Sequence, residues 1–599
     1  MKLKIFVVAL CLSTTQLRTD FHMYFNSGNE CYKTQNFAAA IKFYEQAIAA
    51  NPAPAQLYFN LGLAHAKLNA HDNAVIHFKK AIERNPNYGK AYAHLADSLY
   101  KLNKLDIAIE NYEKALLLEP NNIETHLGIA RVLVDQRKFT QAGQHFNFVI
   151  QREPNNINAL FDLANTLNME NKTEQALERY FKLLPLTGES PSMLYNIAYT
   201  LKKLGRIPEA IDYYQKTLIK DPTNAEAHFS LGLAYLISGN FTRGWPEYEW
   251  RFKRNENSKR SFSRPLWDGS DLQGKIIAIY AEQGLGDTFE FIRYAQVLKE
   301  QGATVIVAVQ SPLVKILGLC PFIDKVFPLG TQLPDHDFAI SLMSLPHILK
   351  TTVDTVPNKL PYLYADLKLT EQWYRALSHD KNFKIGLCWQ GNPNYTTPFL
   401  RHTVAAKSVT ASTFAPLADC AGVSFYSLQK ISGTDQLKDL PAHFVVNDFG
   451  QRLDEEHGRF MDTAAIIQNL NLVLTVDTSI AHLAGGLGVP VWLLLPNPPD
   501  WRWMLDRTDT PWYPNMRLFR QPTPGDWDSV IKEVGAELTK LIHQEHATED
   551  LMLADRTMHE IIEKIGTLQT MLKKIQHPQQ LNTLRAEFEA MQLKIRKCL

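Results

Sequence analysis

Small and aromatic residues recur with a period of 34 over roughly the first 258 residues of the chain. Each period has two small positions and one aromatic position, and a proline closes most periods. Two helices approach closely only where neither carries a large side chain at the crossing, and proline ends a helix because it cannot continue the hydrogen-bond ladder. The pattern therefore predicts helix pairs stacked one after another. The aromatic positions are Tyr44, Phe78, Tyr112, Phe146, Tyr180, Tyr214 and Tyr248.

This period resembles the tetratricopeptide repeat (TPR), in which two antiparallel helices form a unit and the units stack into a superhelix. Seven units fit between residues 21 and 258. The last unit is less regular, as expected of a terminal cap. Repeat arrays bind other molecules, so we expect any chemistry to lie in the rest of the chain.

Beyond residue 258, apolar runs of strand length alternate with helical patterns. A loop at Gly284-Leu-Gly-Asp287 precedes a predicted helix over 288–301, and a second helix is predicted over 479–487. Parallel strands joined by crossover helices are buried on both faces of a sheet. We therefore predict two Rossmann-like halves, residues 259–380 and 381–545, with a cleft between them. The predicted strands are 276–281, 304–309, 385–389, 423–428, 472–476 and 491–495.

The two ends of the chain differ from these regions. Residues 1–20 place lysines before a short apolar run, which is the outline of a weak secretory signal or of a leading apolar helix. Residues 546–599 predict a helical hairpin with an apolar stripe on each arm. Packing on the rest of the chain, pairing with a second copy into a homo-oligomer, and docking of a partner all fit this hairpin.

Composition narrows the possible partners. Lys and Arg total 63 against 62 Asp and Glu, so no basic excess favours nucleic acid or an anionic membrane. No segment has the length of a membrane span. The six cysteines are scattered without metal-ligand spacing, and no Asp, His or Cys cluster suggests a metal. We expect a metal-independent cytoplasmic protein, with export through the weak N-terminal signal as the alternative.

Six motifs follow one another in the second half: AEQGLGD (281–287), FIRY (291–294), GLCWQGNP (386–393), SLQK (427–430), DTAA (462–465) and VDTSIAHLAGGLGVP (476–490). They resemble bacterial TPR glycosyltransferases, whose GT-B region is similar to ADP-heptose:lipopolysaccharide heptosyltransferases (family 9) and more distantly to protein O-GlcNAc transferases (family 41). The resemblance spans about residues 21–540. It implies an inverting, metal-independent enzyme that needs no cofactor and uses a UDP- or ADP-linked sugar donor.

The segment after the strand 472–476 is the candidate donor site. The helix that follows turns its free N–H groups and positive dipole end toward the cleft, where a diphosphate fits. The pair Gly485–Gly486 would let this helix lie close to the sheet. The alternative is that Asp477 or Ser479 only caps the helix and His482 packs against the sheet. By resemblance to the heptosyltransferases, the diphosphate contacts are Asp477, Thr478, Ser479 and His482.

Asp287 is the candidate catalytic base. Its Gly-rich loop, with Gly284 and Gly286, lacks the spacing of a dinucleotide site. In the similar heptosyltransferases this aspartate faces the acceptor, and transfer with inversion needs a group that takes the acceptor proton. Asp287 could equally be the N-cap of a helix that starts at residue 288. For the cation that stabilises the departing diphosphate, Lys407 is the first candidate and Arg401 the second, because the stretch 395–406 departs from the family pattern.

Several further residues follow predicted strand ends, where ligands of open α/β sheets bind. Surface loops are the competing interpretation. The segment Asp500-Trp-Arg-Trp503 could flank a base or sugar, although buried tryptophans of the core are the commoner arrangement. The remaining donor-site candidates are Gln390, Asn392, Gln429 and Lys430.

The favoured hypothesis is transfer of a sugar from a nucleotide donor to an acceptor hydroxyl on a protein or glycan. The concave surface of the repeat array would recruit the acceptor or a partner protein. The alternative is a TPR protein-interaction scaffold whose GT-B region is catalytically inactive, because a fold does not guarantee an activity.

Overall fold

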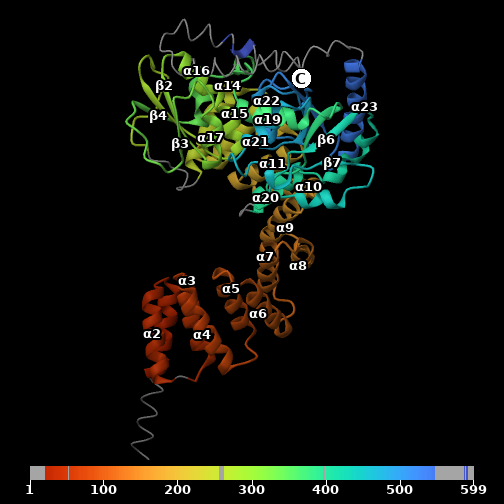
Figure 1. Ribbon diagram of the computed structural model, residues 1–599. Coiled ribbons are helices and arrows are strands. Elements are labelled where there is room, and N and C mark those ends of the chain that lie inside the picture. Colours follow the sequence, from red (N-terminus) through yellow and green to blue (C-terminus); the bar gives the residue numbers. More distant parts are fainter. Residues whose placement is uncertain are drawn as a thin grey trace, which may run out of the picture. The chain divides into compact units, whose positions relative to one another are not determined.

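Figure 1 draws the computed structural model of the chain. Its residues form two compact units that divide between Leu204 and Gly205. Residues 1–19 of the predicted leader and most of the predicted hairpin 546–599 lie outside the described residues. The part of the chain that the structure describes comprises residues 20–51, 53–254, 262–394, 398–546, 586 and 588–590.

The first unit consists of helices that pack on one another in sequence order, as the 34-residue period predicts. Residues 20–33 form its first helix. The helices that follow are α2 (Phe37–Ala50), α3 (Ala55–Lys67), α4 (His71–Arg84), α5 (Gly89–Lys101), α6 (Leu105–Leu118), α7 (Ile123–Asp135), α8 (Phe139–Arg152), α9 (Ile157–Met169), α10 (Thr173–Thr187) and α11 (Pro191–Lys203).

Each helix pair turns through a residue in the left-handed backbone region, and these residues also recur every 34 positions. Asn tolerates this region better than most side chains, and glycine enters it freely because it lacks a Cβ. Three of the turns in the first unit use Asn69, Asn103 and Asn171, with φ between 58° and 63°. Gly205 and Gly239 occupy the same position in the second unit. The residues that form the turns therefore recur with the same period as the residues that pack the helices.

The ends of the helices are also marked in the sequence. Pro86 follows α4 and Pro120 follows α6, as predicted. The side chain of Asn122 accepts a hydrogen bond from the backbone N–H of Thr125, which caps the start of α7. Asn156 caps α9 in the same way.

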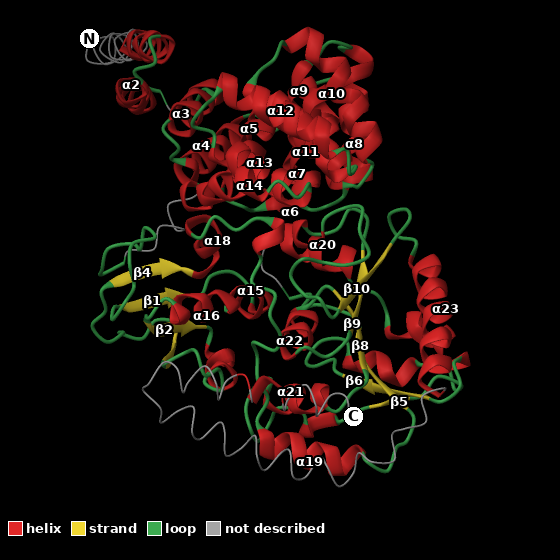
Figure 2. Cartoon of the chain, turned by 90° about the horizontal axis from the view of Figure 1, so that it is seen from above, coloured by secondary structure: helices red, strands yellow, loops and turns green. Residues whose placement is uncertain are grey.

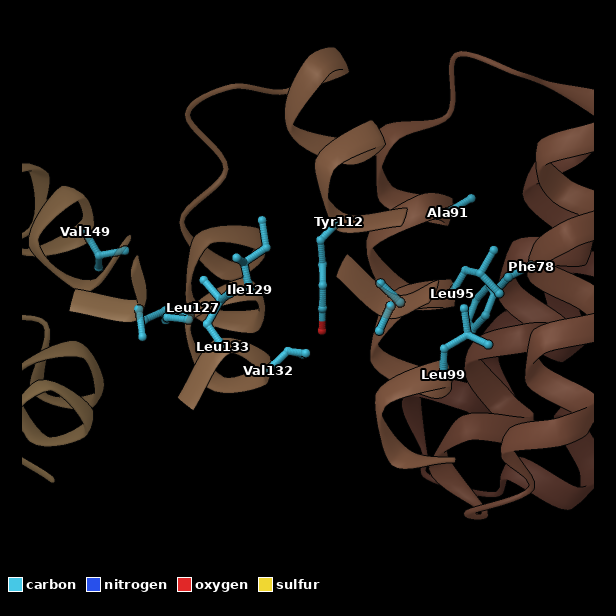
Figure 3. Close-up of a cluster of buried hydrophobic side chains, with 14 of the residues drawn as sticks. Phe78, Ala91, Leu95, Leu99, Tyr112, Leu127, Ile129, Val132, Leu133 and Val149 are labelled. Carbon is cyan, nitrogen blue, oxygen red and sulfur yellow. The ribbon is translucent and has the colours of Figure 1, made fainter. Parts of the chain in front are cut away.

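Aromatic side chains of one helix fill the space left by small residues of its neighbour. A Cβ added to Gly62 would lie 2.7 Å from the ring of Phe78, so only glycine permits this approach. In Figure 3 the ring of Tyr112 lies between side chains of neighbouring helices, and its hydroxyl donates to Asp97. The small positions of the period therefore make room for the aromatic side chains, and the two kinds of position pack together.

The second unit begins with the last repeats, α12 (Ile207–Lys220), α13 (Ala225–Ile237), α14 (Phe241–Tyr248) and the 3-10 helix η1 (Glu249–Lys253). The predicted repeat range 21–258 is thus divided between the two units. The terminal repeat is buried against the α/β region: Trp245 Nε1 donates to Thr351 O over 2.9 Å, and Arg251 forms an ion pair with Glu282.

The first sheet of the second unit is parallel, with strand order β3-β2-β1-β4. The helix predicted over 288–301 begins earlier, at Leu285, and is divided at Ile292. The prediction of its start was wrong because Gly284, three residues before Asp287, is the N-cap. The elements are β1 (Ile276–Tyr280), α15 (Leu285–Phe291), α16 (Arg293–Glu300), β2 (Thr304–Val309), α17 (Val314–Leu317), β3 (Lys325–Pro328), β4 (Phe338–Ser341) and α18 (Leu345–Ile348).

The second sheet is also parallel, with the order β10-β9-β8-β5-β6-β7. Counted from its first strand, β5, this is the 3-2-1-4-5-6 order of doubly wound sheets. α19, at the end of the range predicted for the first half, packs on α21. The elements are α19 (Leu367–Leu377), β5 (Phe383–Cys388), α20 (Pro398–Lys407), β6 (Val423–Ser427), β7 (Val446–Asn447), α21 (Met461–Gln468), β8 (Leu472–Val476), α22 (Ser479–Leu487), β9 (Val491–Leu495), η9 (Trp501–Trp503), β10 (Met516–Arg520) and α23 (Trp527–His546).

Helices α15 and α22 lie between the two sheets and pack on each other (Figures 1 and 2). Gly286 permits the contact, since a Cβ there would lie 2.9 Å from His482 Cδ2. The pair Gly485–Gly486 brings α22 against the Tyr513 ring and Leu363, rather than against the sheet as predicted. The two helices thus bring the ends of both sheets together.

Candidate functional site

A cavity of about 1280 Å³ opens where the carboxyl ends of both sheets meet. Its lining includes residues 282–287 after β1, 390–392 after β5 and 477–480 after β8. In each sheet the strand order reverses at these strands, between β1 and β4 and between β5 and β8. Parallel α/β sheets bind ligands at the carboxyl ends of their strands beside such a reversal. Both sheets therefore present their binding edge to one cavity.

Most of the residues that the sequence marked as candidates line this cavity. Arg401 is exposed on α20 and is not among the lining residues of the described chain. The candidates that line the cavity are Gly284, Gly286, Asp287, Gln390, Asn392, Lys407, Gln429, Lys430, Asp477, Thr478, Ser479 and His482.

Asp287 lies in the first turn of α15, with both carboxylate oxygens engaged. Oδ2 accepts from the backbone N–H of Gly284 over 2.7 Å, and Oδ1 accepts from Arg502. Burial raises the pKa of the carboxyl, although Arg502 and the Gly284 N–H act in the opposite direction. Asp287 thus supports the helix start without being the N-cap itself, and its raised pKa suits a proton acceptor.

Arg502 forms ion pairs with three carboxylates in this part of the site. Its Nη2 donates to Asp287 Oδ1, its Nη1 to Asp500 Oδ1 over 2.9 Å, and its Nε to Glu290 Oε2. Trp501, next to it in η9, is buried and lies 4.4 Å from the guanidinium. In the segment 500–503 both tryptophans are buried in the core, as the commoner arrangement predicts, while Asp500 and Arg502 line the cavity. The sequence did not mark Arg502 or Glu290 individually, because their partners lie more than two hundred residues apart.

Lys407, the last residue of α20, faces the carboxyl end of β8. Its Nζ lies 3.2 Å from Asp477 Oδ2. Burial disfavours the ammonium charge, but Asp477, Asp500 and Asp287 outweigh it and raise the pKa of Lys407 above its usual value. The cavity therefore holds a lysine that stays charged at neutral pH.

His482 lies on α22 and is buried. Its Nδ1 lies 2.9 Å from the Tyr513 hydroxyl, and its Nε2 lies 3.9 Å from Asp477 Oδ1. Burial, together with the cations Arg502 and Lys407, lowers the pKa of His482 well below its usual value. The imidazole is therefore neutral, and its approach to Asp477 is not an ion pair.

The start of α22 faces the cavity through Thr478, Ser479 and Ile480. Thr478 is the N-cap, and its hydroxyl lies 3.3 Å from Thr475 Oγ1. The first N–H groups of a helix have no acceptor within the helix and carry the positive end of its dipole. This edge of the cavity can therefore accept an anionic group.

The candidates after β5 and β6 hold the loops together. Gln429 Oε1 accepts from the N–H groups of Trp389 and Gln390, each over 3.1 Å, and its Nε2 donates to Ser432 O over 2.8 Å. Lys430 Nζ donates to Leu453 O and to Glu455. These two side chains shape the wall of the cavity, with their polar groups already engaged by the protein.

The last repeat also contributes to the cavity wall, through Arg251, Phe252 and Arg254. Arg251 is paired with Glu282, which follows β1. The sequence does not mark these residues for the site, since by their period they belong to the repeat array. The terminal repeat and the two sheets, all in the second unit, therefore share one cavity.

Within residues 20–546 and their gaps as given above, no three His, Cys, Asp or Glu side chains gather as metal ligands would. The helices that the structure describes include none that is long and apolar enough to cross a membrane.

Comparisons with known proteins find the repeats. The family profile "Tetratricopeptide repeat" matches residues 25–89, and "TPR repeat" matches residues 96–136 and 199–239. Protein FlbA of Caulobacter vibrioides is 24% identical over 348 residues, which cover 52% of this chain and 55% of FlbA. The chain therefore spans only about half the length of this curated relative.

Similar solved structures include YrrB, a TPR protein described as having an unusual peptide-binding site. It has 22% identity and a TM-score of 0.26, and the match covers 29% of this chain and 91% of YrrB. PilF of Pseudomonas aeruginosa has 23% identity and a TM-score of 0.31, with 34% and 93% covered. A TPR protein of Parabacteroides merdae has 14% identity and a TM-score of 0.35, with 40% and 94% covered. The profile matches confirm that the chain carries TPR repeats, and a region with parallel sheets follows them.

Proposed function

We propose that the α/β region is a GT-B glycosyltransferase that moves a sugar from a nucleoside diphosphate to an acceptor hydroxyl. The TPR array would recruit the acceptor or a partner protein. The observation that supports transfer most is the single cavity shared by both sheets, with Asp287 on the side of the first and Lys407 with the start of α22 on the side of the second.

The diphosphate would bind at the start of α22. The free N–H groups there, the Ser479 hydroxyl and the Lys407 ammonium can all face its oxygens. Asp477 holds Lys407 charged and in place. As the bond to the sugar breaks, the diphosphate gains negative charge, and preorganised donors and cations stabilise that charge most.

Asp287 would act as the base. The acceptor oxygen forms a bond to the anomeric carbon while its proton passes to the Asp287 carboxylate. The bond from the anomeric carbon to the phosphate oxygen breaks, and its electron pair leaves with the nucleoside diphosphate. Each Asp287 oxygen accepts one hydrogen bond in the structure and keeps a second lone pair for this proton.

The first test is thermal unfolding with a panel of UDP-, ADP- and GDP-sugars, joined to mass spectrometry of candidate acceptors. A ligand that binds only the folded protein stabilises it, by about 2.7 kcal/mol at one hundred times Kd. Asp287→Asn should keep this stabilisation and lose at least 100-fold in transfer. Lys407→Met should lose both, whereas Arg401→Met, a change on the same helix outside the cavity, should lose neither. Transfer at the normal rate by Asp287→Asn would remove the base from the mechanism.

The second candidate is a TPR interaction scaffold with an inactive α/β region. The comparisons favour it, since their profile matches lie in the repeats. In that case the repeats bind a protein, and Arg502 and Asp287 form a structural ion pair. A scaffold with an inactive cleft shows no stabilisation by any nucleotide sugar in the panel, so the same experiment separates the two functions.

A further inference from the structure

The Arg502 guanidinium has three carboxylate partners, and only two of them, Asp287 and Asp500, line the cavity. The third, Glu290, lies on α15 one turn after Asp287 and is 0% exposed. A guanidinium held from the protein interior has its remaining donors fixed in direction. Glu290 therefore determines how Arg502 meets Asp287.

Only one of the two carboxylate oxygens of Glu290 has a hydrogen-bond partner among the described residues. Its Oε1 is buried without a hydrogen-bond partner in the described chain. Burial raises the pKa of Glu290 to about 7, against the opposing effect of Arg502 and Arg293. The titratable and charged groups that face it are Asp287, Arg293, Tyr294, Tyr362, Arg502 and Tyr513.

We propose that Glu290 is a positioning residue of the transfer site, which acts on the Asp287 carboxylate through Arg502. The inference rests on the glycosyltransferase function proposed above. Glu290 does not touch the substrate. When it is ionised, it shares the charge of Arg502, so Asp287 holds a proton more tightly and is the stronger base. When it is neutral, Arg502 is left to the other two carboxylates and weakens Asp287 as a base.

The pH profile of transfer tests this role. Glu290→Gln keeps the shape of the side chain and an oxygen for Arg502 Nε, but removes the charge. The acid limb of kcat should move to lower pH by about one unit, because a like charge near Asp287 is lost. The plateau rate should fall severalfold, because the base is weaker. An acid limb at the wild-type position overturns the proposal.

Asp500→Asn is the matched control, since Asp500 meets the same guanidinium. Its side chain is 38% exposed, so water screens its charge more than that of Glu290. We expect a smaller shift of the acid limb than in Glu290→Gln. Equal shifts in the two variants would overturn a special role for the buried carboxylate.

A double-mutant cycle on stability gives a readout that does not need activity. Urea unfolding of the full chain is measured for Glu290→Gln, Asp287→Asn and the double variant, at about pH 6 and about pH 8. The folded-state pKa of Glu290 lies above its unfolded value, so its charge destabilises the fold increasingly as pH rises toward about 7. The interaction between the two variants should therefore be larger at the higher pH.

The outcomes separate the inference from the function. Additive effects at both pH values overturn the coupling of Glu290 to Asp287, even if transfer is observed. Coupling without binding or transfer of any nucleotide sugar overturns the glycosyltransferase function, and with it the role of Glu290 in transfer.

Discussion

At the scale of single residues, the absence of a side chain at Gly286 lets the two helices beside the cavity pack closely. Gly286 faces His482 across the contact between α15 and α22. The same contact keeps Asp287, the next residue, beside Arg502 of the second half. A glycine at this position therefore serves the geometry of the charged groups as well as packing.

Gly286→Ala tests this contact. The added Cβ would lie 2.9 Å from His482 Cδ2, so the two helices must move apart. Overpacking of this kind destabilises a fold by about 1–3 kcal/mol. Urea unfolding measures the loss, with Gly535→Ala as the control, because its Cβ would meet Leu417 Cδ2 at an ordinary 3.4 Å. Equal stability of the two variants would contradict a tight contact at Gly286.

At the scale of elements, the sequence predicted the repeats well because each repeat is a local unit. The turn residues, caps and aromatic positions that define a pair all lie within 34 residues. The strands β8 and β9 and the helix α22 were predicted with their observed bounds, since buried parallel strands are continuous apolar runs. The start of α15 was missed because Gly284 and Asp287 complete that helix end together.

Phe78→Ala tests the packing of a repeat. Phe78 is fully buried against Gly62, so truncation leaves a cavity that costs about 3–5 kcal/mol. In a repeat array that loss spreads mainly to neighbouring repeats. Ile76→Ala is the control, because Ile76 lies on the same helix and is 50% exposed. Hydrogen exchange should show faster opening of α3 and α4 in Phe78→Ala, and near wild-type exchange in the control.

At the scale of the whole molecule, the last repeats and the α/β region form one compact unit. The unit that starts at Gly205 includes the last repeats and both sheets. Trp245 of α14 is buried next to Trp501 and Trp512, whose rings lie within 6.5 Å of its own. This aromatic cluster joins the terminal repeat to the second sheet's loops.

Trp245→Ala should therefore destabilise the unit that carries the cavity. The loss of a buried tryptophan costs about 3–5 kcal/mol, and Thr351 O loses its donor. Thermal unfolding of the full chain is the measurement. Trp250→Ala is the control, since Trp250 is only partly buried and stacks on His228. Equal destabilisation by Trp250→Ala and Trp245→Ala would show that the aromatic cluster does not hold the terminal repeat to the loops of the second sheet.

The sequence by itself determined the repeat period, the buried strands and the approximate edge of the sheets where the cavity opens. The repeats depend on contacts within about one period, and each buried strand is a continuous apolar run, so the local sequence records both. Only the tertiary structure brought Arg502 to Asp287 and Glu290, and Lys407 to Asp477. Such pairs join segments far apart in the chain, and a charged residue's partner leaves no mark in the residues around it.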